Sequence, residues 1–445
     1  MSKPEEIKKQ ILGLVSEYHR LVHGVEKPFA PGSSRVNYGG RQFDDQELLN
    51  LTEATLEFWL TSGRWTREFE RKLAAFQGLK HCLLVNSGSS ANLLAFMALT
   101  SPLLGERRVR PGDEVVTVAA GFPTTVAPVV QHGAIPVFVD ISLPTANLDL
   151  SLLEAAVGPK TKAVFLAHTL GNPFDVAAVK ACCDAHGLWL VEDNCDALGS
   201  LYHGRPTGSF GDIGTSSFYP PHHITMGEGG AVYTDNHLLA KIMRSLRDWG
   251  RECECDSGQD NKCGRRFSGQ FGSLPAGYDH KYVYSHFGYN LKATDLQAAV
   301  GCAQLDKLPA FVAARRRNWQ FLHDALAPYA EHFILPEPQP GSEPSWFGFM
   351  PTVRSGAPFT RNALVRHIED KNIQTRMLFA GNIVRHPCFA TLAEGKDYRL
   401  AGPLANTDKV MDDAFWLGVY PGMTQPMLDY MAAQIESFLK TGALK

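Results

Sequence analysis

Short apolar runs alternate with amphipathic segments from Thr66 onward, and this pattern predicts β-strands joined by crossover helices. Strands that alternate with helices are typical of an α/β domain with helices on both faces of the sheet. We therefore predict an α/β fold with a mostly parallel seven-stranded sheet. Its predicted strands are Cys82–Val85, Glu114–Val118, Ile135–Val139, Ala163–Ala167, Leu188–Glu192, Thr215–Phe218 and Gly230–Thr234.

Helical periodicity marks the segments on either side of this sheet. Residues 1–25 place apolar side chains at helical spacing and predict an amphipathic arm, and a second helix is predicted from Asp44 to Leu60. After the sheet, helices are predicted at Asp295–Leu308 and Ala310–Leu326, and the remainder predicts a smaller α+β domain. The predicted divisions are an N-terminal arm with its loop at 1–65, a large domain at 66–308 with a cysteine-containing polar insert at 251–277, and a small domain at 309–445.

The composition argues against several classes of partner. Of 445 residues, 43 are Lys or Arg and 46 are Asp or Glu, a formal net charge of −3 without any basic block, so we expect no nucleic-acid partner. The N-terminus lacks the apolar core of a signal peptide and no apolar run is long enough to span a bilayer, so we expect a cytoplasmic protein without a membrane segment. Nine cysteines in a chain of this length do not form a disulfide scaffold.

The segment 217–230 carries the most informative chemistry of the chain. It is predicted as a strand end, a tight turn containing Pro220 and Pro221, a pair of imidazoles at His222 and His223, and a Gly-Glu-Gly-Gly turn into the next strand. An imidazole can transfer protons near neutral pH. Histidine pairs in loops are also common without any function, so these residues alone leave both interpretations open.

The same segment resembles a loop of the DegT/DnrJ/EryC/StrS sugar aminotransferases, which use pyridoxal phosphate on nucleotide-linked keto-sugars. In that family the pattern Ser-Phe-x-x-x-Lys precedes Gly-Glu-Gly-Gly, and the lysine binds the cofactor covalently. Here His222 occupies the lysine position, and no lysine occurs between Lys180 and Lys241. The resemblance therefore implies the aspartate-aminotransferase-like fold (fold type I), with free pyridoxamine phosphate as a dissociable coenzyme and dehydration as the reaction.

A second motif, at residues 86–92, lies between a predicted strand and an apolar helix. Its small residues, among them Gly88 and Ser89, expose backbone N–H groups at a helix N-terminus, which favours phosphate binding. Helix caps of this composition are common, so the motif alone does not define a site. It coincides with the phosphate-binding loop of the family, and the resemblance implies that Ser217 also binds the phosphate.

Three further positions match cofactor-binding residues of the family. Asp193 ends a predicted buried strand, and the resemblance implies that it binds the pyridine nitrogen, whereas a helix N-cap is the alternative. Phe122 is the counterpart of the aromatic that stacks on the cofactor ring, although a core aromatic is the commoner role of such a residue. Asn290 matches an asparagine that reaches the phosphate of the neighbouring subunit, which implies a homodimer.

Four cysteines, Cys195, Cys253, Cys255 and Cys263, have the spacing C-x57-C-x-C-x7-C. The spacing matches neither the paired CxxC of zinc ribbons nor the plant-type ferredoxin run, so by itself it leaves an iron–sulfur cluster, structural zinc and unrelated thiols open. It resembles the cysteine set of the iron–sulfur hexulose-3-dehydrases of the family. That resemblance implies one [2Fe–2S] cluster held by these four residues.

Together these resemblances imply C-3 dehydration of a nucleotide-linked 4-keto-6-deoxyhexose, with CDP-4-keto-6-deoxy-D-glucose as the expected substrate, in the first step of 3,6-dideoxyhexose biosynthesis. His222 is the expected base, and His222 or Tyr219 is expected to return a proton to the departing hydroxyl. Asp196 stands where most relatives have glutamine, and we expect a specialised role beside the cofactor. A separate NADH-dependent flavin iron–sulfur reductase is the expected electron donor, because no flavin- or nicotinamide-binding glycine motif is evident.

Substrate contacts are expected from the small domain. Phe347 and Arg376 match family positions near the sugar nucleotide, and an arginine suits a diphosphate; a core aromatic and a surface charge are the alternatives. The same chemistry on a TDP-4-keto-2,6-dideoxyhexose is an alternative function. So is a cluster-independent sugar dehydratase or aminotransferase, although the missing lysine disfavours an aminotransferase.

Overall fold

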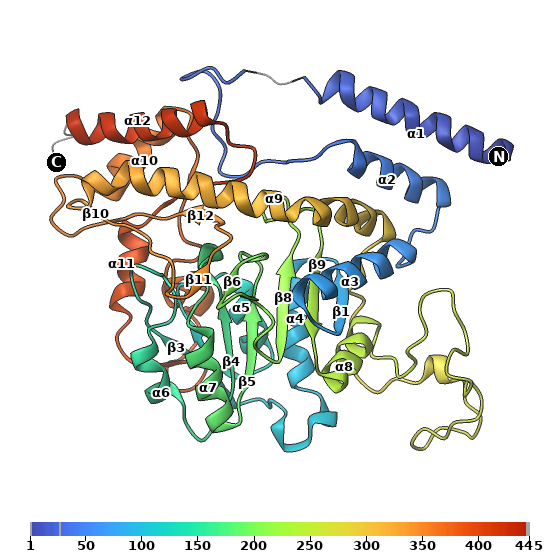
Figure 1. The fold of residues 1–445 in the computed structure, drawn as a ribbon. Coiled ribbons are helices and arrows are strands. Elements are labelled where there is room, and N and C mark those ends of the chain that lie inside the picture. Colours follow the sequence, from blue (N-terminus) through green and yellow to red (C-terminus); the bar gives the residue numbers. More distant parts are fainter. Residues whose placement is uncertain (1, 26–27, 442–445) are drawn as a thin grey trace.

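An eight-stranded sheet forms the centre of the larger of two stacked domains (Figure 1). The computed structural model describes residues 2–25 and 28–441, so the ends of the predicted arm and of the predicted small domain, Met1 and 442–445, lie outside the described residues. The strands follow the order β1-β9-β8-β5-β4-β2-β3-β15. They are β1 (His81–Val85), β2 (Glu114–Val118), β3 (Ile135–Val139), β4 (Thr161–Ala167), β5 (Trp189–Asp193), β8 (Ile213–Ser217), β9 (Gly230–Thr234) and β15 (Arg399–Leu400).

The sheet is mostly parallel, as predicted. Strand β9 runs antiparallel to β1 and β8, and the other strand pairs are parallel. All seven predicted strands are confirmed, each within two residues of its predicted bounds. The count of seven was wrong by one, because β15 joins the edge beside β3 from the C-terminal part of the chain. A strand of two residues has no apolar alternation that a sequence could reveal.

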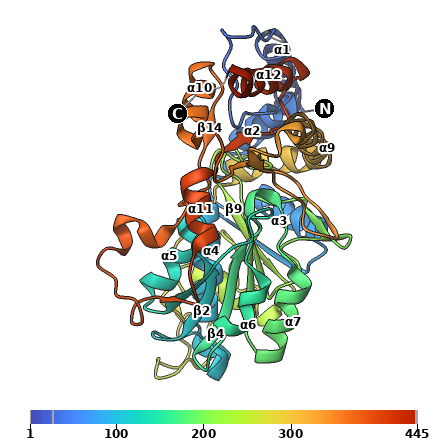
Figure 2. The same ribbon diagram turned by 90° about the vertical axis from the view of Figure 1, so that its left-hand side faces the viewer.

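Helices cover both faces of this sheet (Figure 2). The helices are α4 (Gly88–Leu99), α5 (Pro123–Gln131), α6 (Leu153–Ala156), α7 (Val176–His186) and α8 (His237–Arg247). Val115 points into a buried apolar cluster with α4, α5 and α8, and its neighbour Val116 points into another with α6 and α7. Because successive strand residues face opposite sides, a sheet covered on both faces needs continuous apolar runs.

A single long helix, α9 (Asp295–Leu326), connects the two domains and lies between them (Figures 1 and 2). The two helices predicted on either side of Pro309 are therefore one, and the predicted boundary at residue 308 falls inside it. Helices α1 (Lys3–Val22), α2 (Asp45–Glu57) and α3 (Arg64–Gln77) precede the sheet, and α2 and α3 pack on α9. The Asp295 carboxylate accepts hydrogen bonds from the backbone N–H groups of Gly63, Trp65 and Thr66, which fixes the start of α3 against α9.

The smaller domain consists of short strands and three helices above α9 and beside the sheet. The strands are β10 (Phe333–Ile334), β11 (Ser342–Glu343), β12 (Gly348–Phe349), β13 (Thr352–Val353), β14 (Thr375–Arg376) and β16 (Trp416–Gly418), and the helices are α10 (Arg361–Asp370), α11 (Ala405–Asp413) and α12 (Gln425–Thr441). Strand β11 pairs with β6 (Leu201–Tyr202), which in turn pairs with β7 (Arg205–Pro206). The hairpin β6–β7 therefore ties the small domain to the large one.

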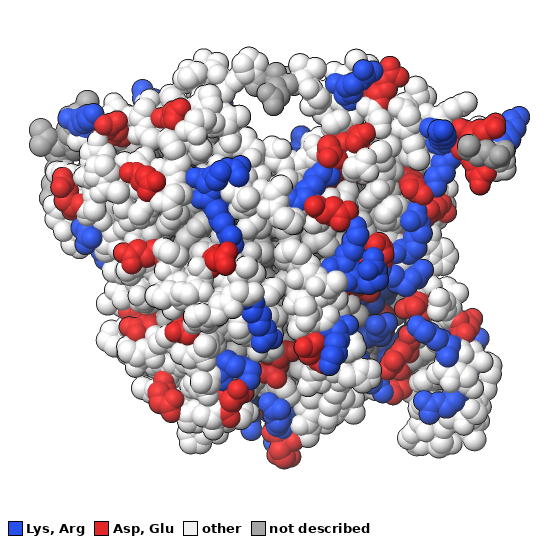
Figure 3. Space-filling model, viewed as in Figure 1, with Lys and Arg blue, Asp and Glu red and all other residues white. Residues whose placement is uncertain are grey.

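Charged side chains of both signs are interspersed over the face shown in Figure 3, including the region where α3 and α9 lie. Two ion pairs join α9 to neighbouring helices. Lys72 Nζ of α3 lies 2.8 Å from Asp306, and Lys307 Nζ lies 2.7 Å from the largely buried Glu47 of α2. Such pairs orient the helices more than they stabilise them. Within the described residues, no helix is long and apolar enough to cross a membrane.

Candidate active site

A cavity of about 470 Å³ opens at the carboxyl edge of the parallel strands. The loops after β1, β2, β5 and β8 contribute its floor, which is where ligands bind in open α/β sheets. The structure brings eleven of the predicted residues together around it: Gly88, Ser89, Phe122, Asp193, Cys195, Asp196, Ser217, Tyr219, His222, Phe347 and Arg376. Residues far apart in sequence therefore form one site.

The turn that enters α4 has the form of an anion-binding site. Ser87 caps the helix by accepting a hydrogen bond from Ser90 N at 3.0 Å, which leaves the first N–H groups of the helix directed at the cavity. A Cβ atom on Gly88 would lie 2.3 Å from Cβ of Ser217, so only glycine allows β8 to approach this turn. Ser89 and Ser217 line the cavity beside it. The turn therefore has the small residues and free donors that a phosphate needs.

Asp193 lines the cavity at the end of β5, and two side-chain donors hold its Oδ2. Asn92 Nδ2 donates to Asp193 Oδ2 at 2.8 Å, and Thr125 Oγ1 donates to the same oxygen at 2.7 Å. Thr215 Oγ1 in turn donates to Asn92 Oδ1 at 2.7 Å, so the orientation of the amide is fixed. Cys195 N donates to the other oxygen, Oδ1, at 3.1 Å. Contacts from β8, α4 and α5 thus fix the Asp193 side chain at the end of β5.

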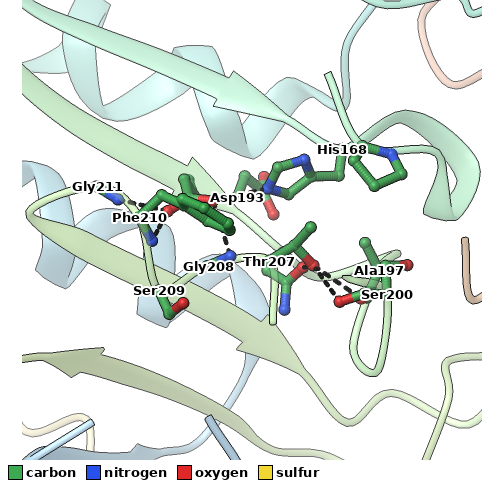
Figure 4. A network of polar contacts seen from close by, with 12 residues as sticks. His168, Asp193, Ala197, Ser200, Thr207, Gly208, Ser209, Phe210 and Gly211 are labelled. Atoms are coloured by element: carbon green, nitrogen blue, oxygen red, sulfur yellow. Dashed lines mark hydrogen bonds and ion pairs between the residues drawn. The ribbon is translucent and has the colours of Figure 1, made fainter. Parts of the chain in front are cut away.

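A second buried carboxylate, on Glu192, holds the end of β5 to the loop at Gly208, Phe210 and Gly211, which lies beside Asp193 in Figure 4. Its oxygens accept hydrogen bonds from the backbone N–H groups of Gly208, Phe210 and Gly211 at 2.8, 2.7 and 2.6 Å, and lie 3.0 Å from His168 Nε2. A buried carboxylate with this many partners is stable and rigid. We conclude that Glu192 is a structural residue that holds its neighbour Asp193 in register.

His222 lies on the turn after β8 with one ring nitrogen occupied. Its Nδ1 lies 2.8 Å from the carbonyl oxygen of Cys195, and because a carbonyl only accepts, Nδ1 carries the hydrogen. Its ring stacks on Phe347, with the centroids 5.1 Å apart and the planes at 25°. The nitrogen left for chemistry is Nε2, which has a free lone pair.

Burial, with a smaller contribution from the positive charge of Arg315, lowers the pKa of His222 to about 4. The hydrogen bond to Cys195 O and the charge of Asp193 act in the opposite direction. Asp196 Oδ1 lies 3.6 Å from His222 Nδ1, too far for a strong hydrogen bond. The imidazole is therefore neutral at physiological pH. A neutral imidazole with a free Nε2 can accept a proton.

Asp196 is a carboxylic acid rather than a carboxylate near neutral pH. Burial and the negative charge of Asp193 raise the pKa of Asp196 to about 8, although Arg315 and the backbone N–H of Leu170 act in the opposite direction. A neutral carboxyl can donate as well as accept a hydrogen bond. The sequence identified Asp196 as unusual but did not reveal this protonation state.

Asp196→Asn is expected to flatten the pH dependence of stability between pH 6.5 and 8. Because the pKa of Asp196 rises from 3.8 to about 8 on folding, the folded chain binds the extra proton here, and stability falls as pH rises. The lowered pKa of His222 opposes this trend only below pH 6.5. The difference between wild type and variant amounts to about 2 kcal/mol over this window.

Urea-unfolding midpoints at pH 6.5 and 8 measure this difference. Asp184→Asn, which removes an exposed carboxylate on α7, serves as the control and keeps the wild-type slope. Equal slopes in wild type and Asp196→Asn contradict the assignment of a protonated Asp196.

Aromatic side chains and Arg376 form the mouth of the cavity. Phe122 and Tyr219 are about half exposed, and Phe122 meets Phe379 edge to face with centroids 5.9 Å apart. Arg376 on β14 lies over the ring of Tyr38, with Cζ 3.9 Å from the ring centroid. The small domain and the N-terminal segment thus supply the outer wall, opposite the phosphate-binding turn.

Asn290 is the predicted cofactor residue that does not line this cavity. It is exposed and pairs through its backbone with Asp248. Its predicted role in a neighbouring subunit therefore stays a prediction.

The structure separates the four predicted cysteine ligands. Cys253, Cys255 and Cys263 line a small hollow in the insert, together with His280. Backbone N–H groups of Lys262 and Arg265 lie 3.4 Å from the sulfurs of Cys255 and Cys263. Cys195 instead lines the main cavity, where burial and the charge of Asp193 raise its pKa. Three of the thiols thus line one hollow, and Cys195 is not among the residues that line it.

Several site residues were not identified from the sequence. Asn92 belongs to the motif at residues 86–92, but its contact with Asp193 was not predicted, and Thr125 lies on α5 without a motif of its own. Tyr38, Phe379 and Trp416 reach the cavity only because the N-terminal segment and small domain fold over it. His280 stands near Cys263, with Nδ1 3.6 Å from the sulfur, and no spacing rule links the two residues.

The cavity fits a pyridoxal-type cofactor. A buried carboxylate held by two donors suits a protonated pyridine nitrogen, and the glycine-containing turn at α4 suits its phosphate. A mostly parallel sheet with this site at its carboxyl edge and a small domain above it defines the class of pyridoxal-phosphate-dependent, aminotransferase-like proteins.

Comparison with known proteins narrows this class to one family. Residues 41–436 match the DegT/DnrJ/EryC1/StrS aminotransferase family, and the chain belongs to it. It is 53% identical over 432 residues to the lipopolysaccharide biosynthesis protein RfbH of Salmonella typhimurium, covering 97% of this chain and 98% of that protein. It is 52% identical over 435 residues to dTDP-4-dehydro-2,6-dideoxy-D-glucose 3-dehydratase of Saccharopolyspora spinosa, covering 98% of this chain and 92% of that protein.

A solved structure has the same fold. The E. coli GDP-4-keto-6-deoxy-D-mannose-3-dehydratase with bound hydrated PLP superposes with a TM-score of 0.81 at 26% identity, covering 90% of this chain and 100% of that chain. The predicted fold and family are therefore confirmed.

Proposed function

We propose that this chain removes the C-3 hydroxyl of a nucleotide-linked 4-keto-6-deoxyhexose, with pyridoxamine phosphate as coenzyme. The observation that carries the proposal is an imidazole in place of an amine: His222 lines the cavity together with Asp193, and none of the described residues that line it is a lysine. Transamination requires a primary amine that binds and releases the cofactor. A neutral imidazole instead suits proton transfer.

Four features would hold the coenzyme. Asp193 would bind the pyridine nitrogen, the turn at Gly88 with Ser217 would bind the phosphate, and Phe122 would cover a ring face. When bound, pyridoxamine phosphate supplies an amine that condenses with the sugar ketone and a ring that accepts electrons. Asn290 of a second subunit is proposed to complete the phosphate site, which makes the functional unit a homodimer.

Proton movement would depend on His222 and its surroundings. Nε2 is the atom that accepts the proton, because Nδ1 is bound to Cys195 O. That proton leaves with the C-3 hydroxyl as water, returned by His222 itself or by Tyr219, whose ring centroid lies 6.3 Å from that of His222. Phe347 covers the imidazole and excludes water from one face. The neutral carboxyl of Asp196 lies beside the same imidazole and is proposed to assist it.

The substrate is proposed to be CDP-4-keto-6-deoxy-D-glucose, with Arg376 binding the diphosphate and Phe347 near the sugar. A TDP-4-keto-2,6-dideoxyhexose is the second candidate, supported by the 52% identity to the Saccharopolyspora spinosa enzyme named for such a substrate. Turnover of the two sugar nucleotides at equal concentration separates these candidates.

Dehydration alone leaves an unsaturated sugar, and two electrons with two protons complete the removal of oxygen. We propose that they come from a separate NADH-dependent flavin iron–sulfur reductase, and that the insert carries a [2Fe–2S] cluster. The support is the hollow lined by Cys253, Cys255 and Cys263, with N–H groups near two of the sulfurs. Since Cys195 lies apart from this hollow, we derive no catalytic step through the cluster.

Spectra of the anaerobically purified protein test the cluster directly. We expect visible absorption bands typical of a [2Fe–2S] centre and an EPR signal after reduction with dithionite. Cys253→Ser is expected to lose both, whereas Cys388→Ser, at an exposed cysteine outside the insert, retains them. A colourless protein that contains zinc contradicts the proposed cluster but does not contradict the proposed dehydration.

The fourth ligand can be assigned by iron content. We propose Cys195, which requires the insert to approach the main cavity when the cluster forms, within one chain or across a dimer. Loss of iron in Cys195→Ser supports this ligand set. Loss of iron in His280→Asn together with full iron in Cys195→Ser assigns His280 instead.

A further inference from the structure

Arg315 is a buried arginine of α9 that the proposed mechanism does not use. Its side chain is 1% exposed. Within the described residues its guanidinium donates to three carbonyl oxygens: Nη1 to Trp346 O at 3.2 Å, and Nη2 to Pro221 O at 3.3 Å and His222 O at 3.0 Å. Its Nε has no hydrogen-bond partner among the described residues. Among the described residues no carboxylate lies within ion-pair distance of the guanidinium, although Asp196 interacts with it electrostatically. Burying a charge with so few partners is costly, and this suggests a function for Arg315.

The three carbonyl oxygens belong to two segments that meet at His222. Pro221 and His222 form the turn after β8, and Trp346 precedes Phe347, whose ring stacks on the His222 imidazole. The Arg315 Cζ lies 5.8 Å from the centroid of that same Phe347 ring. One guanidinium therefore holds both the backbone of His222 and the segment that covers its ring.

A second contact reinforces the junction of these segments. His223 is buried, and its Nε2 lies 2.7 Å from Ser345 O. Ser345 N in turn donates to Ser200 Oγ at 2.7 Å, which connects the segment to the large domain. The contact through His223 fixes the turn on one side, and Arg315 fixes it on the side of α9.

We propose that Arg315 is the positioning residue for His222: by holding the carbonyl oxygens of Pro221, His222 and Trp346, it sets the imidazole against Phe347 with Nδ1 on Cys195 O. This inference rests on the proposed function, in which Nε2 of His222 accepts the proton. The planar guanidinium reaches several oxygens at once, whereas a lysine ammonium in its place is a compact point charge.

The test compares Arg315→Met, Arg315→Lys and the control Arg317→Met, an exposed arginine of the same helix. Nitrogen NMR of the histidine-labelled chain without coenzyme reports the tautomer and pKa of each imidazole, and the His222 signal is assigned by its absence in His222→Asn. Wild type and Arg317→Met are expected to show one Nδ1–H tautomer of His222. Arg315→Met is expected to show averaged tautomers of His222.

Turnover with coenzyme and sugar nucleotide provides the second readout. Arg315→Met is expected to lower kcat on the order of 100-fold with little change in KM, because misplacing the base by about 1 Å has an effect of that size. Arg315→Lys is expected to recover only part of the rate and of the wild-type His222 signal.

An Arg315→Met protein that folds and keeps both the wild-type His222 signal and kcat overturns the proposal. If Arg315→Met does not fold, an unchanged His222 signal and kcat in Arg315→Lys overturn it. Absence of dehydration by the wild-type protein rejects the proposed function instead, and the NMR comparison still decides the role of Arg315.

Discussion

His222→Asn is expected to lower the rate of dehydration by roughly 10²- to 10⁴-fold, the usual contribution of a general base. Asparagine retains a side-chain N–H for the carbonyl of Cys195, which His222 contacts at 2.8 Å, but it has no basic nitrogen at the position of Nε2. The measurement is single-turnover loss of the C-3 hydroxyl with saturating pyridoxamine phosphate. Coenzyme affinity is expected to stay within a few-fold of wild type, because Asp193 and the phosphate-binding turn are unchanged.

Two further variants test whether this loss is specific to the imidazole at position 222. His237→Asn removes an exposed imidazole on α8 and is expected to retain full activity. His222→Lys introduces a primary amine into a cavity that has none among its described lining residues, and with pyridoxal phosphate it is expected to give a borohydride-stable adduct. A wild-type rate of dehydration in His222→Asn contradicts the assignment of His222 as the base. A borohydride-stable adduct of the wild-type protein supports the aminotransferase alternative.

Asp193→Asn is expected to weaken coenzyme binding by roughly 10- to 150-fold, from the loss of one charge-assisted hydrogen bond of about 1.5–3 kcal/mol. The amide oxygen of asparagine can still accept from Asn92 and Thr125, so the chain itself is expected to fold normally. The rate at saturating coenzyme is also expected to fall, because a pyridine ring without a proton on its nitrogen accepts electrons poorly.

Equilibrium titration of the coenzyme absorbance measures this affinity. Thr125→Val removes one of the two donors to Asp193 Oδ2 and is expected to give a smaller loss than Asp193→Asn. A wild-type affinity in Asp193→Asn contradicts the assignment of Asp193 to the pyridine nitrogen.

Whether an element of this fold could be predicted depends on the pattern of apolar and polar residues along it. Strands β1 to β5 and β9 were found because burial on both faces requires apolar runs, which these strands have. The edge strand β15 was missed, because two residues paired beside β3 leave no periodic signal. The single helix α9 was divided in two at Pro309, because proline usually breaks a helix although tertiary packing can retain it.

The candidate site was predictable where its residues sit at strand ends. Asp193, Ser217 and the turn at Gly88 follow apolar runs, and parallel strands place their carboxyl ends at one edge. Asn92 and Arg315 were not found, because each acts through a contact with a residue about a hundred positions away. No local pattern encodes such contacts.

By itself, the sequence determined the α/β class, the strand ends that form the site and the replacement of a lysine by His222, since these depend on apolar periodicity and on the identity of single residues. Only the tertiary structure decided the protonation of the site: burial and neighbouring charges, which exist only in the folded chain, make His222 neutral and keep the proton on Asp196. The structure also decided that three of the four cysteines share one hollow while Cys195 lies in the other cavity. Spacing along the chain does not determine distance in space, because strands β8 and β9 and helix α8 lie between Cys195 and the insert.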